Sequence, residues 1–410
     1  MKYVIIGNSA AGIGAVEGIR QVDKQGEITI ITNEPHHTYS RPLISYLLLG
    51  KVTEETMKYR NDNFYTENNC KLLADVAVTK IDAKAKQVIV SDNSRVPYDK
   101  LLVAAGSSAF VPPFEGLDSV KDQCTFMSLD DARKLDKALT PNKRVLIIGA
   151  GLIGLKCAEG IAERAAHITV IDLAPRILSS ILDDDGAKVV QSHIESKGVE
   201  FKLAASVKKF AGNTATLESG ESISFDILVL AVGVRPNTAL LKDIATIDRG
   251  IVVNNKSATS APDIFAAGDC TQTLDVSSGQ NKIMALLPNA YMQGECAGVN
   301  MAGGDKTFDK AIPMNAIGFF GLHMITAGNY TGDVFTGQVA HNNEYKRLFH
   351  HDNKLNGYIL IGNVEKAGIY TSLIRERTPL DTIDFALVCE KPGLMAFTKE
   401  DRMTKLGGAA

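Results

Sequence analysis

The sequence predicts an α/β fold with two parallel-sheet units and a smaller α+β region towards the C-terminal end. Residues 3–34 have the order strand, glycine turn, helix, strand and acid, and residues 144–172 repeat that order. The first glycines of the two turns, Gly7 and Gly149, lie a whole domain length apart, which argues against a short-repeat solenoid. Residues 309–388 alternate short strand patterns with turn residues. These observations indicate two similar domains and a third of a different kind.

The composition is that of an ordinary globular protein. Of its 410 residues, 45% are apolar and 22% are charged, and the net charge of −3 gives no reason to expect nucleic-acid binding. No apolar run reaches the ~18 residues that would span a membrane. The apolar segment Tyr3–Ile6 is too short for a signal peptide and fits a first strand better, so the expected location is the cytoplasm.

The six cysteines are scattered along the chain. None of them forms a C-x-x-C pair or has the spacing of metal ligands, so we expect no metal site and no iron–sulfur centre within the chain. Isolated cysteines in a cytosolic protein are usually buried thiols. These residues are Cys70, Cys124, Cys157, Cys270, Cys296 and Cys389.

Each of the two repeated units has four expected segments. Short apolar runs suit buried parallel strands, and the residues after each glycine turn suit a helix. The first unit comprises strand Tyr3–Ile6, turn Gly7–Gly12, helix Ile13–Val22 and strand Ile28–Thr32. The second comprises strand Arg144–Ile148, turn Gly149–Gly154, helix Leu155–Arg164 and strand Ile168–Ile171.

The rest of the chain is expected to be mostly short strands. Residues 107–118 contain two prolines and are expected to be a linker. Residues 93–94 suit a turn between the second and third strands of the region 72–104. The expected strands are a run ending at Asp82, then Gln87–Ser91, Leu101–Ala104, Ala215–Leu217, Ile227–Ala231 and Ile251–Val253, and a hairpin of Tyr345–His350 with Leu355–Ile361.

The second glycine turn has the full G-x-G-x-x-G pattern. Gly149 permits a tight turn, Gly151 lets the backbone approach a phosphate, and Gly154 lets the helix pack on the strand. Asp172 ends the next strand, where a carboxylate accepts hydrogen bonds from a ribose 2′-hydroxyl and repels a 2′-phosphate. This favours NADH over NADPH. Arg176 lies four residues further on and could accept a phosphate, so NADPH remains an alternative cofactor.

The first turn is a variant of the same pattern. Ser9 replaces the middle glycine between Gly7 and Gly12, and its hydroxyl can itself bond a phosphate. Glu34 is the corresponding ribose-binding acid. One such turn is a weak signal, but two turns with flanking strands, helices and acids predict two Rossmann-like dinucleotide-binding domains.

Two further strand ends could contribute to a nucleotide site. Gly106, in Ala104-Ala-Gly106, allows a close backbone approach. Asp269, after Ala266-Ala-Gly268, could bond a ribityl hydroxyl or, through water, a phosphate. Either segment alone is also compatible with an ordinary strand end.

Together these motifs resemble the pyridine nucleotide–disulfide oxidoreductases over roughly residues 1–385. Ala104–Gly106 resembles the family's A-T-G segment, Ala231–Asn237 the segment that closes its NADH domain, and Ile264–Asp269 its second FAD segment. The resemblance implies FAD in the first domain and NADH in the second. It also implies that Asp269 holds the ribityl chain or pyrophosphate of FAD, and that Val78 meets adenine through its backbone.

Two other segments narrow the resemblance. Tyr39–Tyr46 is similar to the flavin-facing loop of NADH:rubredoxin oxidoreductases and of the flavoprotein part of nitrite reductases. Leu287–Gly294 is similar to the segment that enters the helix beneath the flavin in those proteins. The positive end of that helix would stabilise charge on a reduced flavin.

The turns and the resemblance together give two sets of expected cofactor-binding residues. The set for FAD is Gly7, Ser9, Ala10, Ala11, Gly12, Glu34, Arg41, Pro42, Val78, Ala105, Gly106, Asp269 and Pro288. The set for NAD is Gly149, Gly151, Leu152, Ile153, Gly154, Asp172 and Gly233.

Several departures from the family bear on the chemistry. Thiol-dependent relatives keep a C-x4-C pair on the first helix or one cysteine near residue 42, where this chain has Pro42, and the His-Pro pair of their C-terminal domain is absent. Thiol chemistry is therefore not expected. Lys156 stands where relatives often have glutamate; it could face the flavin, face an acidic partner or be an exposed helix lysine. Arg41 and Lys156 are the electrostatic candidates for catalysis.

The expected domains are an FAD-binding domain of residues 1–111 and 238–308, an NAD-binding domain of residues 112–237, a C-terminal interface domain of residues 309–388 and a tail of residues 389–410. The expected reaction is hydride transfer from NADH to FAD, followed by electron transfer to an external rubredoxin, ferredoxin or iron–sulfur subunit. Two alternatives stay open: an NADH oxidase that reduces oxygen, and an NADH-oxidising subunit of a larger redox complex. The C-terminal region could form a homodimer or a hetero-complex, and the amphipathic stretch Leu394–Leu406 could dock a partner.

Overall fold

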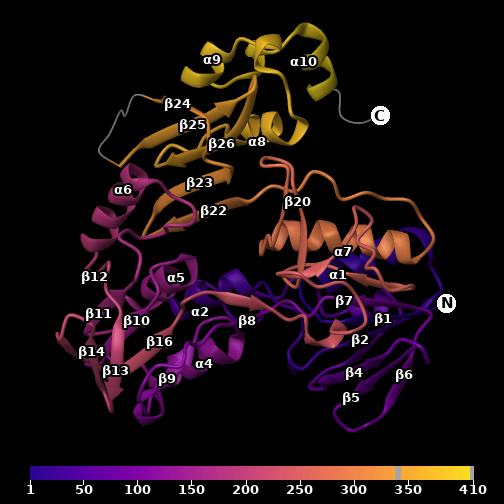
Figure 1. The fold of residues 1–410 in the computed structure, drawn as a ribbon, viewed down its shortest axis with the longest axis horizontal. Coiled ribbons are helices and arrows are strands. Elements are labelled where there is room, and N and C mark those ends of the chain that lie inside the picture. The colour runs from indigo at the N-terminus through magenta and orange to yellow at the C-terminus, as the bar shows by residue number, and fades with distance from the viewer. Residues whose placement is uncertain (338–342, 407–410) are drawn as a thin grey trace.

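The first parallel sheet is assembled from strands that are far apart in the sequence. The computed structural model describes residues 1–337 and 343–406 (Figure 1). The sheet has the order β19-β7-β1-β2-β3, and all its neighbours are parallel. Its strands are β1 (Lys2–Ile6), β2 (Glu27–Ile31), β3 (Cys70–Leu73), β7 (Lys100–Val103) and β19 (Ile264–Ala266).

Both faces of this sheet are covered, as the continuous apolar strands predict. Tyr3 and Ile5 point to one face and pack against α1 (Ala10–Val22) and α7 (Leu287–Met301). Val4 and Ile6 point to the other face. A small antiparallel sheet covers that second face and consists of β4 (Val78–Asp82), β5 (Gln87–Val90) and β6 (Arg95–Pro97).

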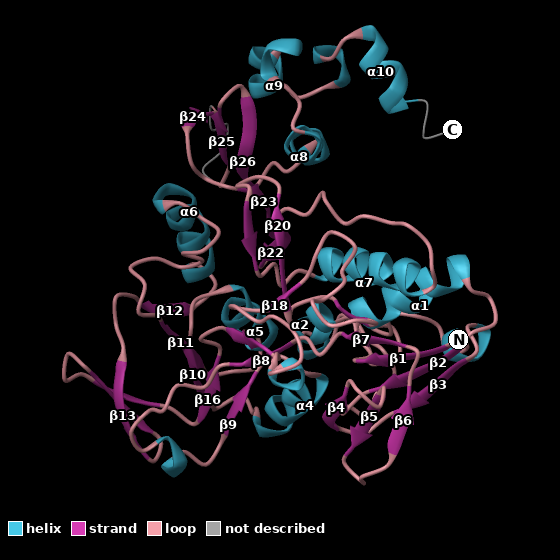
Figure 2. Cartoon of the chain, turned by 45° about the vertical axis from the view of Figure 1, so that its right-hand side comes forward, coloured by secondary structure: helices cyan, strands magenta, loops and turns pink. Residues whose placement is uncertain are grey.

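Helices α1 and α7 lie side by side in Figures 1 and 2 and pack backbone to backbone. Gly14 and Gly18 face α7, and Gly294 and Gly298 face α1. A Cβ at any of these four positions would overlap a backbone oxygen of the facing helix. The two helices therefore approach each other closely because glycines recur every four residues on both.

The second parallel sheet repeats the arrangement of the first. Its order is β12-β11-β10-β16-β9, with α5 (Leu152–Ile161) following its central strand as α1 follows β1. The strands are β9 (Gln123–Thr125), β10 (Arg144–Ile148), β11 (His167–Ile171), β12 (Val199–Lys202) and β16 (Ile227–Leu230). Further elements here are α4 (Leu129–Ala138), α6 (Asp184–Glu195), β13 (Val207–Ala211), β14 (Thr214–Leu217) and β15 (Ser222–Ser224). The predicted pair of Rossmann-like domains is confirmed.

Three local predictions need correction. Helices α1 and α5 begin at Ala10 and Leu152, three residues before the predicted starts, because the last residues of each glycine turn already form the first helical turn. The turn at residues 93–94 leads into β6 instead of the strand at residue 101. The expected linker 107–118 begins with a strand, β8 (Ser107–Ala109), which pairs antiparallel with β17 (Val234–Pro236) between the two domains.

The C-terminal domain contains an antiparallel sheet with the order β22-β23-β26-β25-β24. It stands above the two nucleotide-binding domains in Figures 1 and 2. The predicted hairpin is confirmed as β25 and β26. The elements are β22 (Met314–Phe319), β23 (Leu322–Gly328), β24 (Asp333–Thr336), β25 (Tyr345–His351), β26 (Lys354–Ile361), α8 (Ala367–Glu376), α9 (Phe385–Glu390) and α10 (Lys399–Leu406).

The predicted tail, residues 389–410, contributes to this domain's core. Ala396 and Phe397 are buried in the same cluster as Val388 and Cys389. Residues 407–410 lie outside the described residues. The domain boundaries themselves stay predictions. No helix within the described parts of the chain is long and apolar enough to cross a membrane.

The contact between α1 and α7 gives a test of the fold. We expect Gly294→Ala to lower the free energy of unfolding by about 1–3 kcal/mol, because its Cβ would overlap the backbone oxygen of Ala11. Urea unfolding measures the change. Gly368→Ala in α8 is the matched control. Apart from its chain neighbours and its own helix backbone, no atom of the described residues lies within 4 Å of its Cβ position, so stability should be unchanged or slightly increased. Equal unfolding midpoints for the two variants would contradict the close packing.

Candidate active site

The first glycine turn leaves the start of α1 open for an anion. Gly7 has a φ of +114°, and a Cβ there would overlap the carbonyl oxygen of Ala104. A Cβ at Gly12 would overlap the carbonyl oxygen of Gly7. Ser9 is the N-cap, yet its side chain makes no hydrogen bond to the first turn of α1, which begins with Ala10 and Ala11. The N–H groups at this helix start are thus free of a side-chain cap, as phosphate binding requires.

The second turn has the same backbone geometry with more room. Gly149 has a φ of +115°, and a Cβ there would overlap the carbonyl oxygen of Ala231. A Cβ at Gly154 would overlap the carbonyl oxygen of Gly149. By contrast, apart from its chain neighbours, no atom of the described residues lies within 4 Å of the Cβ position of Gly151, just before Leu152 and Ile153 in α5. This open space at a helix start can admit a pyrophosphate.

Asp172 lies directly beside the second turn. Its Oδ2 accepts a hydrogen bond from the Ala150 N–H at 2.6 Å, and its Oδ1 accepts one from the Ala174 N–H at 2.8 Å. These bonds fix the carboxylate while each oxygen keeps a further lone pair for a ribose hydroxyl. Arg176 is held by Asp184, with 3.1 Å between Nη1 and Oδ1. The guanidinium is therefore already paired, which weakens the argument for a bound 2′-phosphate.

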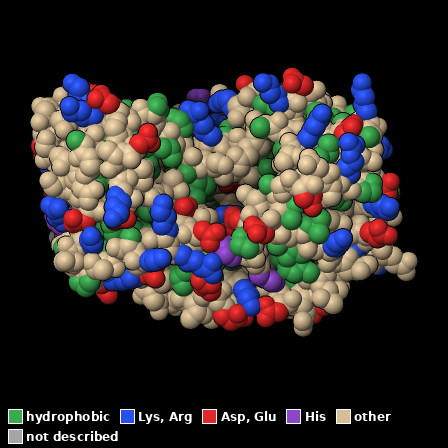
Figure 3. All heavy atoms as spheres, turned by 90° about the horizontal axis from the view of Figure 1, so that it is seen from below, with side chains coloured by type: hydrophobic (Ala, Val, Ile, Leu, Met, Phe, Trp, Pro, Cys, Tyr) green, Lys and Arg blue, Asp and Glu red, His purple; other side chains and the backbone are tan. Residues whose placement is uncertain are grey.

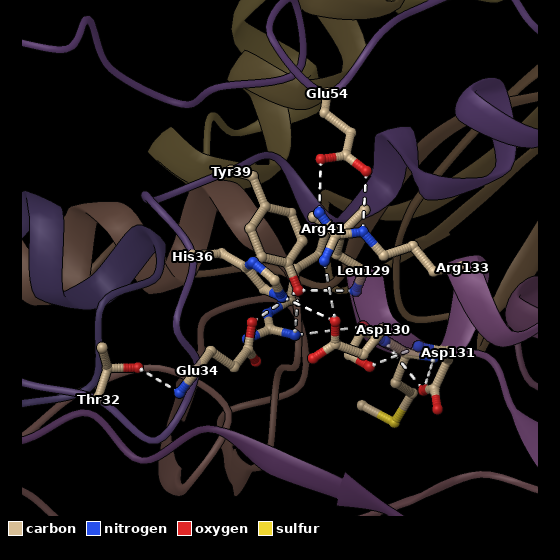
Figure 4. A network of polar contacts seen from close by, with 12 residues as sticks. Thr32, Glu34, His36, Tyr39, Arg41, Glu54, Leu129, Asp130, Asp131 and Arg133 are labelled. Carbon is tan, nitrogen blue, oxygen red and sulfur yellow. Dashed lines mark hydrogen bonds and ion pairs between the residues drawn. The ribbon is translucent and has the colours of Figure 1, made fainter. Parts of the chain in front are cut away.

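Glu34 is fixed differently, by side chains of its own loop (Figure 4). The Tyr39 hydroxyl donates to Oε2 at 2.8 Å, and the Arg41 guanidinium forms an ion pair with Oε1. Arg41 Nη1 also donates to the Tyr39 hydroxyl at 3.1 Å. Burial is the largest cause of a raised pKa of Tyr39, so its hydroxyl stays protonated and remains a donor.

The same loop is bonded to the start of α4 in the second domain. The Tyr39 hydroxyl accepts the Leu129 N–H at 3.0 Å, and Arg41 donates to the Met127 carbonyl at 3.3 Å. His36 Nε2 lies 2.9 Å from Asp130 Oδ1. Figure 4 shows these groups converging from both domains. The acid of the first unit thus belongs to a network that connects the two domains.

An exposed ion pair extends this network. Arg133 of α4 donates to both oxygens of Glu54, at 2.9 and 2.7 Å. On the face drawn in Figure 3, the surface is hollowed near its centre, and acidic, basic and histidine side chains gather around the hollow.

Asp269 and Gly106 lie where the strands of the first sheet end. The Ser107 hydroxyl donates to Asp269 Oδ2 at 3.2 Å. Burial raises the pKa of Asp269, while the Ser107 hydrogen bond and the charge of Arg41 oppose that shift. Gly106 has a φ of +63° and open space around its Cβ position, and the Ala105 carbonyl accepts from Asn237 Nδ2 at 2.8 Å.

Four other predicted residues lie at the ends of elements. Pro288 is in the first turn of α7, and Pro42 is in the short 3-10 helix η1 (Arg41–Leu43); both are exposed. Val78 begins β4 and pairs with Val90. Gly233 has a φ of +109° with open space around its Cβ position.

Three polar residues with unpaired buried atoms lie beside the first turn, and sequence reasoning missed two of them, Asn8 and Thr38. Asn8 Oδ1 accepts from the Tyr65 hydroxyl at 3.0 Å. Asn8 Nδ2, His37 Nε2 and Thr38 Oγ1 are buried and have no hydrogen-bond partner among the described residues. An unpaired buried polar atom costs about 1–3 kcal/mol, so these groups fit a site whose ligand supplies the partners. Asn8 could have been found from its place as a polar residue inside the glycine turn.

Lys156 is buried, so the expectation of an exposed helix lysine is wrong. Only 11% of its side chain is exposed, and its ammonium group pairs with Glu159 and lies 4.4 Å from the centre of the Tyr46 ring. Nothing in the local sequence indicates this burial, because Tyr46 is far away in the chain.

The cysteines are all free; five are buried and Cys70 is partly buried. Burial raises the pKa of Cys70 to about 11 and that of Cys124 to about 12. The buried-thiol prediction is therefore confirmed for five of the six. Within residues 1–337 and 343–406, no three His, Cys, Asp or Glu side chains form a metal-binding group.

Two dinucleotide-binding domains, each with an open helix start and its own acid, define a nucleotide-dependent oxidoreductase. A family model described as pyridine nucleotide-disulphide oxidoreductase matches residues 1–294, and one described as rubredoxin NAD+ reductase C-terminal domain matches residues 313–378. The chain belongs to the pyridine nucleotide-disulphide oxidoreductase family. It is an NAD(P)H-dependent flavoprotein oxidoreductase with the cofactors FAD and NADH.

Two relatives and one solved structure are similar to this chain over most of its length. The NADH-dependent phenylglyoxylate dehydrogenase subunit epsilon of Aromatoleum evansii is 32% identical over 391 residues, which cover 92% of each chain. The rubredoxin-NAD(+) reductase of Pseudomonas putida is 30% identical over 310 residues, which cover 74% of this chain and 80% of the relative. A putidaredoxin reductase, solved as a covalent complex with putidaredoxin, shares the fold with a TM-score of 0.89 at 22% identity, over 100% of this chain and 99% of that one.

The raised thiol pKa values predict low reactivity in the folded protein. At pH 8 a thiol with a pKa of about 11 is thiolate in only roughly one molecule in a thousand, far less than an ordinary cysteine. Iodoacetamide should therefore label the native chain slowly at pH 8 and faster as the pH approaches 11. Mass spectrometry should find all six sites modified after unfolding. A thiol that reacts rapidly in the native chain would contradict this.

The position of Asp172 predicts nucleotide preference. We expect Asp172→Asn to raise the half-saturating NADH concentration about tenfold and to improve NADPH relative to NADH, because a charged acceptor and its repulsion of a 2′-phosphate are both lost. Flavin bleaching at varied NADH and NADPH concentrations measures both. Asp118→Asn, at an exposed acid of the same domain, is the control and should leave both values unchanged. An unaltered preference in Asp172→Asn would refute the assignment.

Proposed function

We propose that this chain transfers hydride from NADH to FAD and then passes electrons one at a time to a separate carrier protein, with rubredoxin as the leading class. The pairing of two open helix starts with two differently held acids carries this proposal. FAD, when bound, supplies the ability to accept a hydride and to release single electrons, while the protein supplies binding, orientation and electrostatics.

For FAD, we propose the first turn and the strand ends around it as the binding residues. Gly7 to Gly12 would hold the pyrophosphate at the start of α1, and Glu34 would accept the ribose hydroxyls. Arg41, which is paired with Glu34, would hold that carboxylate in place beside the cofactor. Ala105, Gly106, Pro42, Val78 and Pro288 would contact the rest of the cofactor.

For NADH, we propose the second turn together with Asp172 and Gly233. The open space beside Gly151 supports the approach of the pyrophosphate, and the fixed carboxylate of Asp172 supports binding of an unphosphorylated ribose. The pairing of Arg176 with Asp184 favours NADH for the same reason.

The external acceptor follows from the state of the thiols. No cysteine lies in the loop around Pro42, and burial raises the pKa of the thiols, so electrons would leave the flavin directly. The likeness to the rubredoxin-NAD(+) reductase of Pseudomonas putida and to a rubredoxin NAD+ reductase C-terminal domain supports a small electron carrier as acceptor. Free thiols also fit the reducing cytoplasm, which we propose as the compartment.

A second candidate is an NADH-oxidising subunit of a larger dehydrogenase. The likeness to a named subunit over 92% of both chains favours it. Met395 and Met403, which follow α9, are 75% and 67% exposed and would suit a partner subunit. Assembly through the C-terminal region, with another subunit or with a second copy, is part of this proposal.

The test is anaerobic stopped-flow with the purified, FAD-loaded chain. We expect NADH to bleach the flavin absorbance within the stopped-flow time course. Addition of oxidised rubredoxin should then restore the flavin absorbance faster than oxygen does. A flavin that NADH leaves unbleached would refute the proposal. Faster reoxidation by oxygen than by rubredoxin or ferredoxin would point to an NADH oxidase, and co-purification with a dehydrogenase subunit would favour the second candidate.

A further inference from the structure

Lys156 lies at the point where three parts of the fold meet. It belongs to α5, just after the second glycine turn, and its side chain is 11% exposed. Its Nζ lies 4.4 Å from the centre of the Tyr46 ring and 3.3 Å from the carbonyl oxygen of Gly318. Tyr46 is in α2 (Ile44–Leu48) of the first domain, and Gly318 is in β22 of the C-terminal domain.

Glu159 completes this arrangement one turn along α5. Its Oε2 pairs with Lys156, and its Oε1 accepts the Phe320 N–H at 2.8 Å. Only 8% of the Glu159 side chain is exposed. A buried charge is costly unless it is paired and hydrogen-bonded, and here each charge has both kinds of partner.

Helix α5 runs along α2 from this point. The Cβ position of Gly160 is 3.0 Å from the Ser45 carbonyl oxygen, and Arg164 Nη1 donates to the Leu48 carbonyl at 3.3 Å. Lys156 and Gly160, four residues apart, therefore contact α2 from one face of α5, and Arg164 continues these contacts from the turn after the helix. Of these three residues, Lys156 lies nearest the glycine turn.

The partners of the Lys156 ammonium group match its N–H donors in number. It has three N–H bonds. They meet the Glu159 carboxylate, the Gly318 carbonyl and the face of the Tyr46 ring. A cation is attracted more strongly to the face of an aromatic ring when the site is desolvated. Such a group can hold neighbouring elements in place, but it is not free to contact the reacting atoms.

We propose that Lys156, clamped by Tyr46 and Glu159, is a positioning residue that sets the distance between the two nucleotide-binding turns for hydride transfer. This rests on the proposed function. It assigns Lys156 a structural role in place of the electrostatic one predicted from the sequence. It also adds Tyr46 and Glu159 to the residues that determine the rate. A misplacement of about 1 Å can slow a reaction about 100-fold without abolishing binding.

The test compares two disruptive variants with two conservative ones. Lys156→Met with Glu159→Gln removes both charges together, so no uncompensated carboxylate stays buried. Tyr46→Leu removes the ring and keeps the ion pair. Lys156→Arg keeps the cation, and Tyr46→Phe keeps the ring face. Lys188→Met, at a 77% exposed lysine of α6, is the matched control.

Anaerobic stopped-flow gives the bleaching rate at saturating NADH and the NADH concentration for half-saturation. We expect the two disruptive variants to bleach about 10- to 100-fold more slowly, with half-saturation changed by no more than about threefold. Tyr46→Phe, Lys156→Arg and the control should bleach within about threefold of the wild type. FAD content and reduction by dithionite should match the wild type in every variant, and the two disruptive variants should still melt cooperatively, at a lower temperature.

Several results would overturn the proposal. Wild-type bleaching rates in both disruptive variants would show that the clamp does not affect hydride transfer. Loss of FAD or of cooperative melting in both would show a purely structural role. Slow bleaching in the conservative variants as well would mean that neither the cation nor the ring face is what matters. The result for the wild type distinguishes the two proposals. If NADH does not bleach its flavin, the proposed function fails. If NADH bleaches it and the variants are unaffected, only the positioning role of Lys156, Tyr46 and Glu159 is overturned.

Discussion

The fold depends on two glycine positions, each in a turn after a central strand, where a side chain cannot be accommodated. At Gly7 and Gly149 the turn after a central strand touches the carbonyl oxygen at the end of the neighbouring strand, Ala104 or Ala231. This contact fixes how far each helix start can lie from its sheet. It places the first N–H groups of α1 and α5 at the carboxyl edge of parallel strands, where ligands of such sheets bind. The acids, the loops and the packing of the helices are arranged around these two points.

The two halves share a backbone plan but hold their acids by different means. Asp172 is fixed by backbone N–H groups of its own domain, so its position follows from the local chain alone. Glu34 is fixed by Tyr39 and Arg41, and those side chains are also bonded to the start of α4 in the other domain. The position of Asp172 therefore depends only on its own domain, whereas the position of Glu34 also depends on how the two domains are arranged. The two similar units thus contain one acid that is held within its own domain and one that is held between the two domains.

The sequence predicted what is local and missed what depends on distant partners. Strands such as Arg144–Ile148 are short apolar runs, and the glycine spacing identifies the turns, so both follow from neighbouring residues. The strand Ser107–Ala109 has no apolar pattern and exists because Val234–Pro236 pairs with it. The burial of Lys156 likewise depends on Tyr46 and Gly318, which are remote in the chain. Unpaired polar atoms at Asn8 and Thr38 become visible only when burial is known.

The pairing of β8 with β17 has a consequence for the order of folding. The first sheet is completed by β19 beside β7, with residues 104–263 between them, so an unfolded intervening chain would make that pairing costly in entropy. Ala109 and Val234 are direct partners in the ribbon, which brings the entry and exit of the inserted domain together. Once the insert has folded, it acts as a short connection. The second domain should therefore form first and allow the first to close, the reverse of their order along the chain.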